Sequence, residues 1–153
     1  MSSFLVIKIN EQYVAILAKS IQRVVRVVEM TPMVTTISLI EGVIDIHGSV
    51  VPVVFLSKLL NNPQKELTLD NVLVVTQVEN FHVALLADDV EGVYSLEAFE
   101  PEFKNEKELM IHNTQVVHWN EELLPVLNLE PLLQERVGSL EPIKNLCQES
   151  HDE

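Results

Sequence analysis

The chain has 153 residues, enough for one compact unit or two closely packed halves, and its 47% hydrophobic content predicts a buried core and excludes a disordered body. Its net charge of −13, from 23 acidic and 10 basic residues, argues against nucleic acid and anionic lipid as partners, because both bind clustered Lys and Arg. We therefore expect protein partners, and electrostatic steering would favour basic surfaces on them.

The sequence also indicates a compartment. It holds a single cysteine, Cys147, so no internal disulfide can form. It shows neither a signal peptide nor a stretch of about 20 apolar residues that could span a bilayer. These features predict a cytoplasmic protein in a reducing environment.

The expected elements are mostly short strands separated by turns. In chain order the patterns predict strands at residues 5–9, 13–17, 24–28, 43–46, 50–54, 72–78, 81–86, 114–119 and 123–127. Residues 20–25 fit a short helical turn, and a closing helix is expected over 129–137, where Gly138 follows as a stop signal. The fold class is therefore all-β, with a few short helices.

Proline marks an unusual strand in each half of the chain. Pro52 lies within the expected strand 50–54, which must be an edge strand or carry a bulge, because proline cannot donate a hydrogen bond to a neighbouring strand. Pro125 takes the corresponding place in the second half. This shared feature indicates that the halves are structurally related.

Two blocks of sequence occur twice, in the same order. Residues 51–60 align with 124–133 at an offset of 73, and residues 13–24 align with 82–93 at an offset of 69. This period is too long for a solenoid repeat. We therefore expect one domain, 1–138, made of two intertwined halves with repeat units of about 4–62 and 70–133. Residues 139–153 are acidic and polar and are expected to form a flexible tail.

The same motifs resemble a known family. Gly-Val-Ile-Asp-Ile-x-Gly at 42–48 followed by Val-Val-Pro-Val-Val-x-Leu at 50–56 resembles the CheW-like domain of bacterial chemosensory adaptors. Residues 82–90 and 123–129 resemble the second half of that domain, so the match runs from about Phe4 to Leu133. The resemblance implies two SH3-like, five-stranded β-barrels, in a divergent member of the family.

The resemblance also implies a function. It indicates a non-enzymatic adaptor or scaffold in chemotaxis signal transduction, which couples the cytoplasmic tips of methyl-accepting chemoreceptors to a CheA-type histidine kinase. Its association with the membrane would then be indirect, through receptor arrays. The regulatory domain of such a kinase is itself a CheW-like double barrel. The receptor tip, a helical hairpin, would lie along the groove between the barrels.

Site residues follow from the same resemblance. The candidates for receptor binding are Val24, Val25, Ile46 and His47. The candidates for kinase binding are Ser49, Val50, Asp88, Val90 and Gly92.

Several positions depart from the family pattern. His47 stands where the family usually has Arg, Arg23 where it often has an acid, and Phe55 where it has Asp. His47 could replace the arginine as a weaker, pH-sensitive contact, or serve only the geometry of its turn. The glycine expected in the final hairpin is also absent. Asp88 fits the family's second-half Asp, and its alternative reading is a cap for the following turn.

Other functions were weighed against this one. Two of the five histidines, His112 and His118, are six residues apart, but no familiar metal-binding spacing occurs, and Cys147 with His151 lies in the expected tail. No phosphate-binding glycine loop is present. We expect no enzyme activity, no cofactor and no metal. The remaining alternatives are an adaptor in a pilus-motility or other chemosensory-like pathway, and a double barrel that binds a small ligand.

Overall fold

The computed structural model describes residues 1–26, 30–33, 37–61, 68, 70–101 and 115–148. Its strands are β1 (Ser2–Ile9), β2 (Gln12–Leu17), β3 (Ile21–Arg26), β4 (Thr31–Pro32), β5 (Ile40–Ile46), β6 (Ser49–Phe55), β7 (Val72–Val78), β8 (Phe81–Ala87), β9 (Asp89–Leu96), β10 (Ala98–Phe99), β11 (Val116–Trp119) and β12 (Glu122–Pro125). Its helices are the 3-10 turn η1 (Ala18–Ser20), α1 (Leu56–Leu59), α2 (Leu129–Val137) and α3 (Glu141–Gln148). The all-β prediction is confirmed, while residues 21–26 form a strand rather than the helical turn expected over 20–25.

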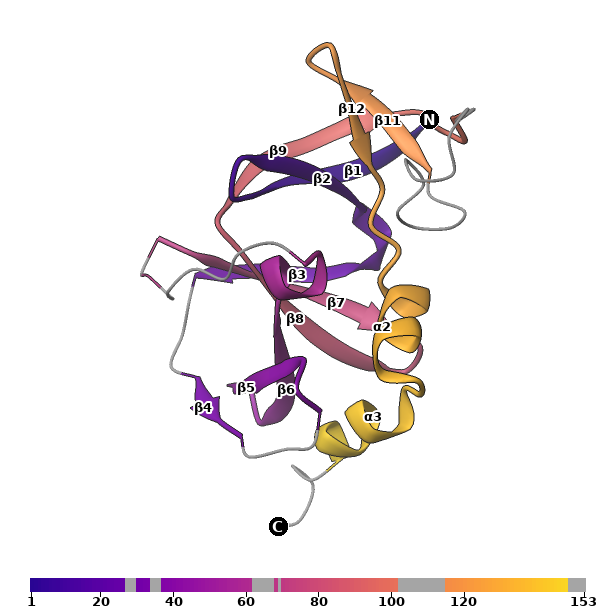
Figure 1. Cartoon of the computed structure of the whole chain (residues 1–153). Coiled ribbons are helices and arrows are strands. Elements are labelled where there is room, and N and C mark those ends of the chain that lie inside the picture. The colour runs from indigo at the N-terminus through magenta and orange to yellow at the C-terminus, as the bar shows by residue number, and fades with distance from the viewer. Residues whose placement is uncertain (27–29, 34–36, 62–67, 69, 102–114, 149–153) are drawn as a thin grey trace.

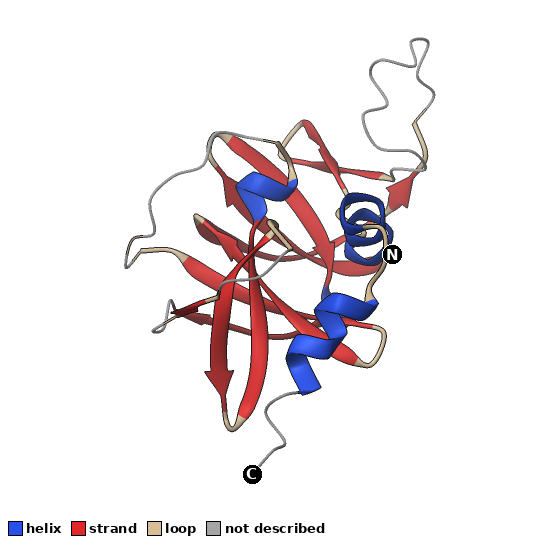
Figure 2. Cartoon of the chain, turned by 60° about the horizontal axis from the view of Figure 1, so that its bottom comes forward, coloured by secondary structure: helices blue, strands red, loops and turns tan. Residues whose placement is uncertain are grey.

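The strands form two units, one above the other in Figure 1. The lower unit is a six-stranded sheet in the order β3-β7-β8-β6-β5-β4. The upper unit combines the sheets β2-β1-β9 and β10-β11-β12, which a parallel bridge between Ala15 and Val126 connects. Figure 2 shows the helices lying against these strands.

Each unit takes strands from both repeats. The hairpin β1–β2 of the first repeat lies in the upper unit with β9 to β12, and the equivalent hairpin β7–β8 lies in the lower unit with β3 to β6. The parallel pairs show this exchange most directly. Val53 pairs with Ala84 in the lower unit, and the residues at the equivalent positions, Val126 and Ala15, form the bridge in the upper unit.

In each unit, the two strands at opposite ends of the strand order follow one another in the chain. In the lower unit β3 and β4 stand at opposite ends of the strand order, yet only residues 27–30 separate them. In the upper unit β9 and β10 stand at opposite ends, separated by Glu97. A short stretch of chain therefore joins the edges of each sheet, as a small barrel requires. The closure of each unit into the expected five-stranded barrel stays a prediction.

Each unit has its own small core, and the two cores correspond position by position. The upper core contains Phe4, Val6, Ala15, Val117, Trp119 and Leu124. The equivalent positions in the lower core are Leu73, Val75, Ala84, Ile44, Ile46 and Val51, of which Ile46 is partly buried. The repeat seen in the sequence is therefore a repeat of packing.

A third and larger core lies between the units and under the helices. Ile7 and Ile9 of β1 face Val74 of β7 and Leu85 of β8 in it, and α2 and α3 cover it with Leu133 and Ile143, neither of which is exposed. The predicted closing helix 129–137 is confirmed, and Gly138 after it has a left-handed φ of 92°.

The prediction of a flexible tail from residue 139 is wrong for residues 141–148. These residues form α3, because Leu140 and Ile143 reach the central core and bury apolar surface there. Residues 149–153 lie outside the described residues. Among the helices of the described residues, none is long and apolar enough to cross a membrane.

The expectation that Pro52 lies on an edge strand or at a bulge is wrong, because β6 stands between β8 and β5 and its pairing with β5 is regular at Pro52. The parallel ladder between β6 and β8 begins at Val53, so at Pro52 the described neighbour of β6 is β5 alone. Pro125 likewise stands directly before the bridge residue Val126. In both units the proline stands one residue before the parallel pairing begins, so its missing N–H group removes no bond from that pairing.

Candidate functional site

The tip of the β5–β6 hairpin carries four of the candidate residues. His47 and Gly48 form its turn with positive φ values of 51° and 88°, and the Gly48 amide donates to Oδ1 of Asp45 at 2.8 Å. The predicted turn chemistry of His47 is therefore confirmed. The side chains of His47 and Ser49 are exposed, and those of Ile46 and Val50 are half-buried. The tip thus presents His47 to solvent, and its role in receptor binding stays a prediction.

Strand β3 carries the other two receptor candidates on opposite faces. Val24 is 42% exposed, whereas Val25 packs against the lower core, as Ile46 does. β3 and β5 are therefore connected through one apolar cluster, although three strands lie between them in the sheet. Arg23 shares the face of Val25, and Arg26 shares that of Val24.

Asp88 joins the end of β8 to the turn between β1 and β2. Its carboxylate accepts a hydrogen bond from the amide of Asn10 at 2.7 Å, and its own amide donates to the carbonyl of Lys8 at 2.9 Å. Asn10 has a positive φ of 55°, so this contact supports a tight turn. Asp88 therefore has a structural role, at a turn far from it in sequence.

Val90 and Gly92 follow on β9, away from the hairpin tip. Val90 packs against the central core, and Gly92 pairs with Val6 of β1 with a φ of 146°. A Cβ at Gly92 would lie 3.3 Å from the ring of Tyr94, so the absence of a side chain lets that ring lie across the strand. The kinase candidates therefore fall into two sets, one on β6 and one at β8–β9.

A groove of about 700 Å³ lies between the units, beside α2. Apolar side chains such as Ile16, Leu85 and Leu127 line it together with three glutamates, Glu100, Glu130 and Glu135. Lys, Arg and His are absent from its described lining, and so are all of the candidate site residues. The candidate receptor residues therefore do not line this groove, and their role in receptor binding stays a prediction.

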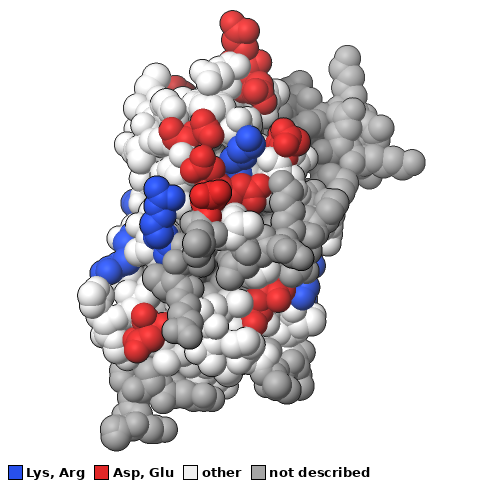
Figure 3. All heavy atoms as spheres, turned by 90° about the vertical axis from the view of Figure 1, so that its left-hand side faces the viewer, with Lys and Arg blue, Asp and Glu red and all other residues white. Residues whose placement is uncertain are grey.

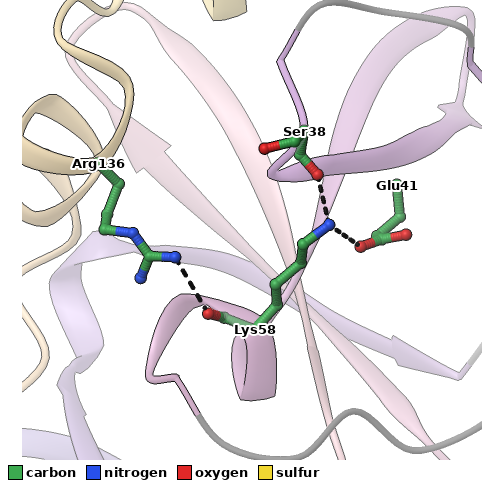
Figure 4. Close-up of polar contacts among 4 residues, drawn as sticks. All are labelled: Ser38, Glu41, Lys58 and Arg136. Carbon is green, nitrogen blue, oxygen red and sulfur yellow. Dashed lines mark hydrogen bonds and ion pairs between the residues drawn. The ribbon is translucent and has the colours of Figure 1, made fainter.

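A polar network joins α1, α2 and the residues around the start of β5 (Figure 4). Lys58 of α1 donates to the carbonyl of Ser38 at 2.5 Å and forms an ion pair with Glu41 at 3.1 Å. Arg136 of α2 donates to the carbonyl of Lys58 at 3.4 Å. These cations are engaged in contacts that hold the fold together.

Cys147 is half-buried on α3, and burial raises the pKa of its thiol above the ordinary value of 9.0. A hydrogen bond with the backbone of His82 lowers the pKa but does not cancel this shift. A raised pKa keeps the thiol protonated and poorly nucleophilic. In the part of the chain that the structure describes, no three His, Cys, Asp or Glu side chains gather as metal ligands, and His112 and His151 lie outside that part.

Two exposed apolar side chains on β9 were not among the sequence candidates. Val93 is 61% exposed and Tyr94 is 37% exposed. At the repeat offset of 69 residues, Val93 is equivalent to Val24, and Tyr94 is equivalent to Val25. That correspondence was the signal in the sequence that could have identified them.

Comparison with known proteins identifies the family. The model of the CheW-like domain matches residues 3–137, which is most of the chain. This chain belongs to the CheW-like domain family. A curated CheW-like relative, the chemotaxis protein CheW of Thermotoga maritima, is 31% identical over 86 residues, and the match covers 56% of this chain and 56% of that protein. The chain therefore matches about half the length of this relative.

A solved structure shares the fold of this CheW-like chain. The scaffolding protein TtCheW from Thermoanaerobacter tengcongensis superposes with a TM-score of 0.72 at 19% sequence identity. The superposition covers 86% of this chain and 91% of that one. The similarity confirms the fold, with both units included.

Proposed function

We propose that this chain is a non-enzymatic adaptor that couples methyl-accepting chemoreceptors to a CheA-type histidine kinase in chemotaxis signalling. The observation that carries the proposal is the family match over residues 3–137, since it includes both repeats and hence both units. A fold alone does not determine function, so the proposal rests on this family relation and on the separate exposed surfaces that the two units offer. The adaptor would act at the cytoplasmic side of receptor arrays.

The receptor's helical tip would contact the lower unit. Val24 is exposed on the edge strand β3, and His47 is exposed at the hairpin tip. Because His47 stands where the family usually has arginine, the contact would be weaker. Exposed apolar side chains such as Val24 would supply most of the binding energy.

The kinase's regulatory domain would contact surfaces in both units. Ser49 and Val50 on β6 stay candidates for one part of this contact, and the β8–β9 region with Val90 and Gly92 for the other. Asp88 would act indirectly, since its carboxylate holds the β1–β2 turn beside this region.

Calorimetric titration tests the proposal directly. The purified chain is titrated with the regulatory domain of the CheA-type kinase from its own organism and, separately, with a receptor cytoplasmic fragment. We expect wild-type affinities in the micromolar range or tighter for both. His47→Arg should tighten receptor binding, and Val24→Asp should weaken it at least tenfold, since it puts a charge at an apolar contact.

The control is Glu79→Gln, which changes an exposed charge at the turn between β7 and β8, outside the proposed surfaces. It should bind both partners as the wild type does. Absence of wild-type binding to either partner would overturn the adaptor function. Kinase binding without receptor binding would instead favour an adaptor for a different receptor system, such as pilus motility.

The groove between the units provides a specific reason to test the alternative of a small ligand. Its three glutamates and its lack of described cationic lining residues would favour a cationic molecule over an anionic one. Thermal shift measurements with a set of cationic and neutral metabolites test this alternative. A shift that Glu130→Gln abolishes would favour ligand binding as a second function.

A further inference from the structure

Strands β3 and β9 occupy equivalent positions in the two units. Each is an edge strand in its described sheet, β3 beside β7 and β9 beside β1. Each has a β-bulge at the same place. Gln22 is the extra residue of β3 in its pairing with β7, and Glu91 is the extra residue of β9 in its pairing with β1. The two strands are therefore two versions of one local structure.

Both strands expose an apolar side chain at the same position. Val24 on β3 is 42% exposed, and its equivalent on β9, Val93, is 61% exposed. Tyr94 follows Val93 and is 37% exposed, with its ring held against Trp119 at 5.6 Å. Successive side chains of a strand point to opposite faces, as those of Val24 and Val25 do, so the Tyr94 ring packs on Trp119 while Val93 presents its apolar side chain on the other face.

The two strands differ in charge. β3 contains Arg23 and Arg26 and no acid, and its neighbour β7 has no charged residue. β9 contains Asp89 and Glu91 and no base. Lys8 of β1 lies opposite Asp89, which leaves Glu91, at the bulge, as the acid next to Val93.

The wider surface of the upper unit has the same sign. Glu11, Glu97, Glu121 and Glu122 are exposed on it, outside β9. Figure 3 shows acidic side chains gathered over the upper part of the face that it draws. A partner approaching this end of the molecule therefore meets negative potential around an apolar centre.

We propose that Glu91 and Val93, the β9 surface, dock a basic protein surface that has an apolar pocket. The inference rests on the proposed function, within which this partner is the kinase's regulatory domain. Charge complementarity determines the choice of partner. Because β3 is basic and β9 is acidic, each strand favours a different partner and disfavours the partner of the other strand. The acidic β9 surface repels an acidic partner, while β3 offers such a partner Arg26 and the exposed Val24, which share a face.

A second copy of the chain is the competing occupant of the β9 surface. The basic strand β3 of one copy could meet the acidic strand β9 of the next, which would build a head-to-tail assembly. The net charge of −13 on every copy opposes this association. The basic surface of another protein carries no such penalty.

Two substitutions on β9 test the proposal, with calorimetric titration against the kinase's regulatory domain at about 50 and 300 mM salt. Val93→Asp should weaken binding at least tenfold, because it places a charge at the apolar centre. Glu91→Lys should also weaken binding at low salt and should reduce the salt dependence. Both side chains are exposed, so circular dichroism and thermal unfolding should show a folded protein.

The matched control is Leu123→Asp, which puts the same charge at another exposed apolar position of the upper unit, 53% exposed on β12. It should leave kinase affinity within twofold of wild type. Wild-type binding that neither β9 substitution weakens would overturn the β9 surface and leave the adaptor function standing. No wild-type binding would overturn both. Sedimentation of the chain alone completes the test, since self-association that Val93→Asp abolishes would show a second copy as the occupant.

Discussion

Arg136 donates a hydrogen bond to the carbonyl oxygen of Leu59 at 2.5 Å, across from α2 to the end of α1. It also reaches the carbonyl of Lys58, as Figure 4 shows. The last carbonyls of a helix lack partners within the regular helix, so other donors satisfy them. The Lys58 carbonyl also accepts from the amide of Asn61 at 3.1 Å. Because α1 and α2 belong to different repeats, this guanidinium holds the two repeats together beside the central core.

Replacing Arg136 with methionine should therefore lower stability. The substitution keeps a long apolar side chain but removes the donor, and we expect a loss of about 1 kcal/mol in the free energy of unfolding. Urea denaturation followed by circular dichroism measures it. Lys19→Met, which removes an exposed cation from η1, is the control and should change little. Equal stability of Arg136→Met and wild type would show that water satisfies these carbonyls equally well.

Asp88→Ala should destabilise the upper unit more than Asp89→Ala. Asp88 accepts the amide hydrogen of Asn10 across 78 residues of sequence, whereas the described bond of Asp89 is to the adjacent amide of Val90. A charge-assisted bond of this kind contributes about 1–3 kcal/mol, and Asp88→Asn should retain part of it. Hydrogen exchange at Asn10, measured by NMR, locates the effect. Exchange at Asn10 that Asp88→Ala does not accelerate would contradict the assigned role.

Some of this fold could be predicted from local sequence and some could not. The hairpins and the helix at 129–137 follow from alternation, turn residues and Gly138, which act over short distances. The exchange of hairpins could not be predicted, because Ala15 and Ala84 are interchangeable partners for Val53 and Val126. Only packing across the whole chain decides between them.

The candidate site also contains some features that could be predicted from local sequence and others that could not. The geometry of the His47–Gly48 turn follows from residue type, since both residues must adopt positive φ. Exposure on β9 does not follow from residue type, because valine is usually buried, whereas Val93 on the edge strand β9 is 61% exposed. The sequence did carry a signal for α3, because Leu140, Ile143 and Leu146 recur at helical spacing. Leu140, just before the helix, and Ile143 within it anchor α3 in the central core.

The turn between β11 and β12 holds strain that glycine should relieve. Glu121 has a φ of 64° at the position equivalent to Gly48, and a left-handed conformation costs a residue with a side chain about 1–2 kcal/mol. Glu121→Gly should therefore raise the free energy of unfolding by about 1 kcal/mol, after the greater entropy of the unfolded chain is subtracted. Thermal and urea unfolding measure the gain. The reverse change, Gly48→Ala, should destabilise, and opposite signs for both would contradict this account.

The docking of α3 predicts a large effect at one residue. Ile143 has no exposed surface and lies in the central core, so Ile143→Ala should cost about 2–5 kcal/mol. Asn145→Ala, on the same helix but exposed, is the control and should be nearly neutral. Unfolding in urea compares the two. If Ile143→Ala were as stable as Asn145→Ala, α3 would not be part of the cooperative fold.

The reactivity of the Cys147 thiol should depend on pH in a way that reports its burial on α3. Burial raises the pKa of its thiol in the folded state above 9.0, and the reactive form is the thiolate. Native Cys147 should therefore react more slowly with iodoacetamide than the unfolded chain does at the same pH, with its rate inflection above pH 9.0. The stabilisation linked to this group is fully present below the unfolded pKa and is lost as pH rises through the folded one, because the unfolded chain releases the proton first. Ile143→Ala should loosen α3 and bring the native rate toward that of the unfolded chain. An inflection below pH 9.0 in the wild type would mean that the thiol is solvated and that α3 does not cover it.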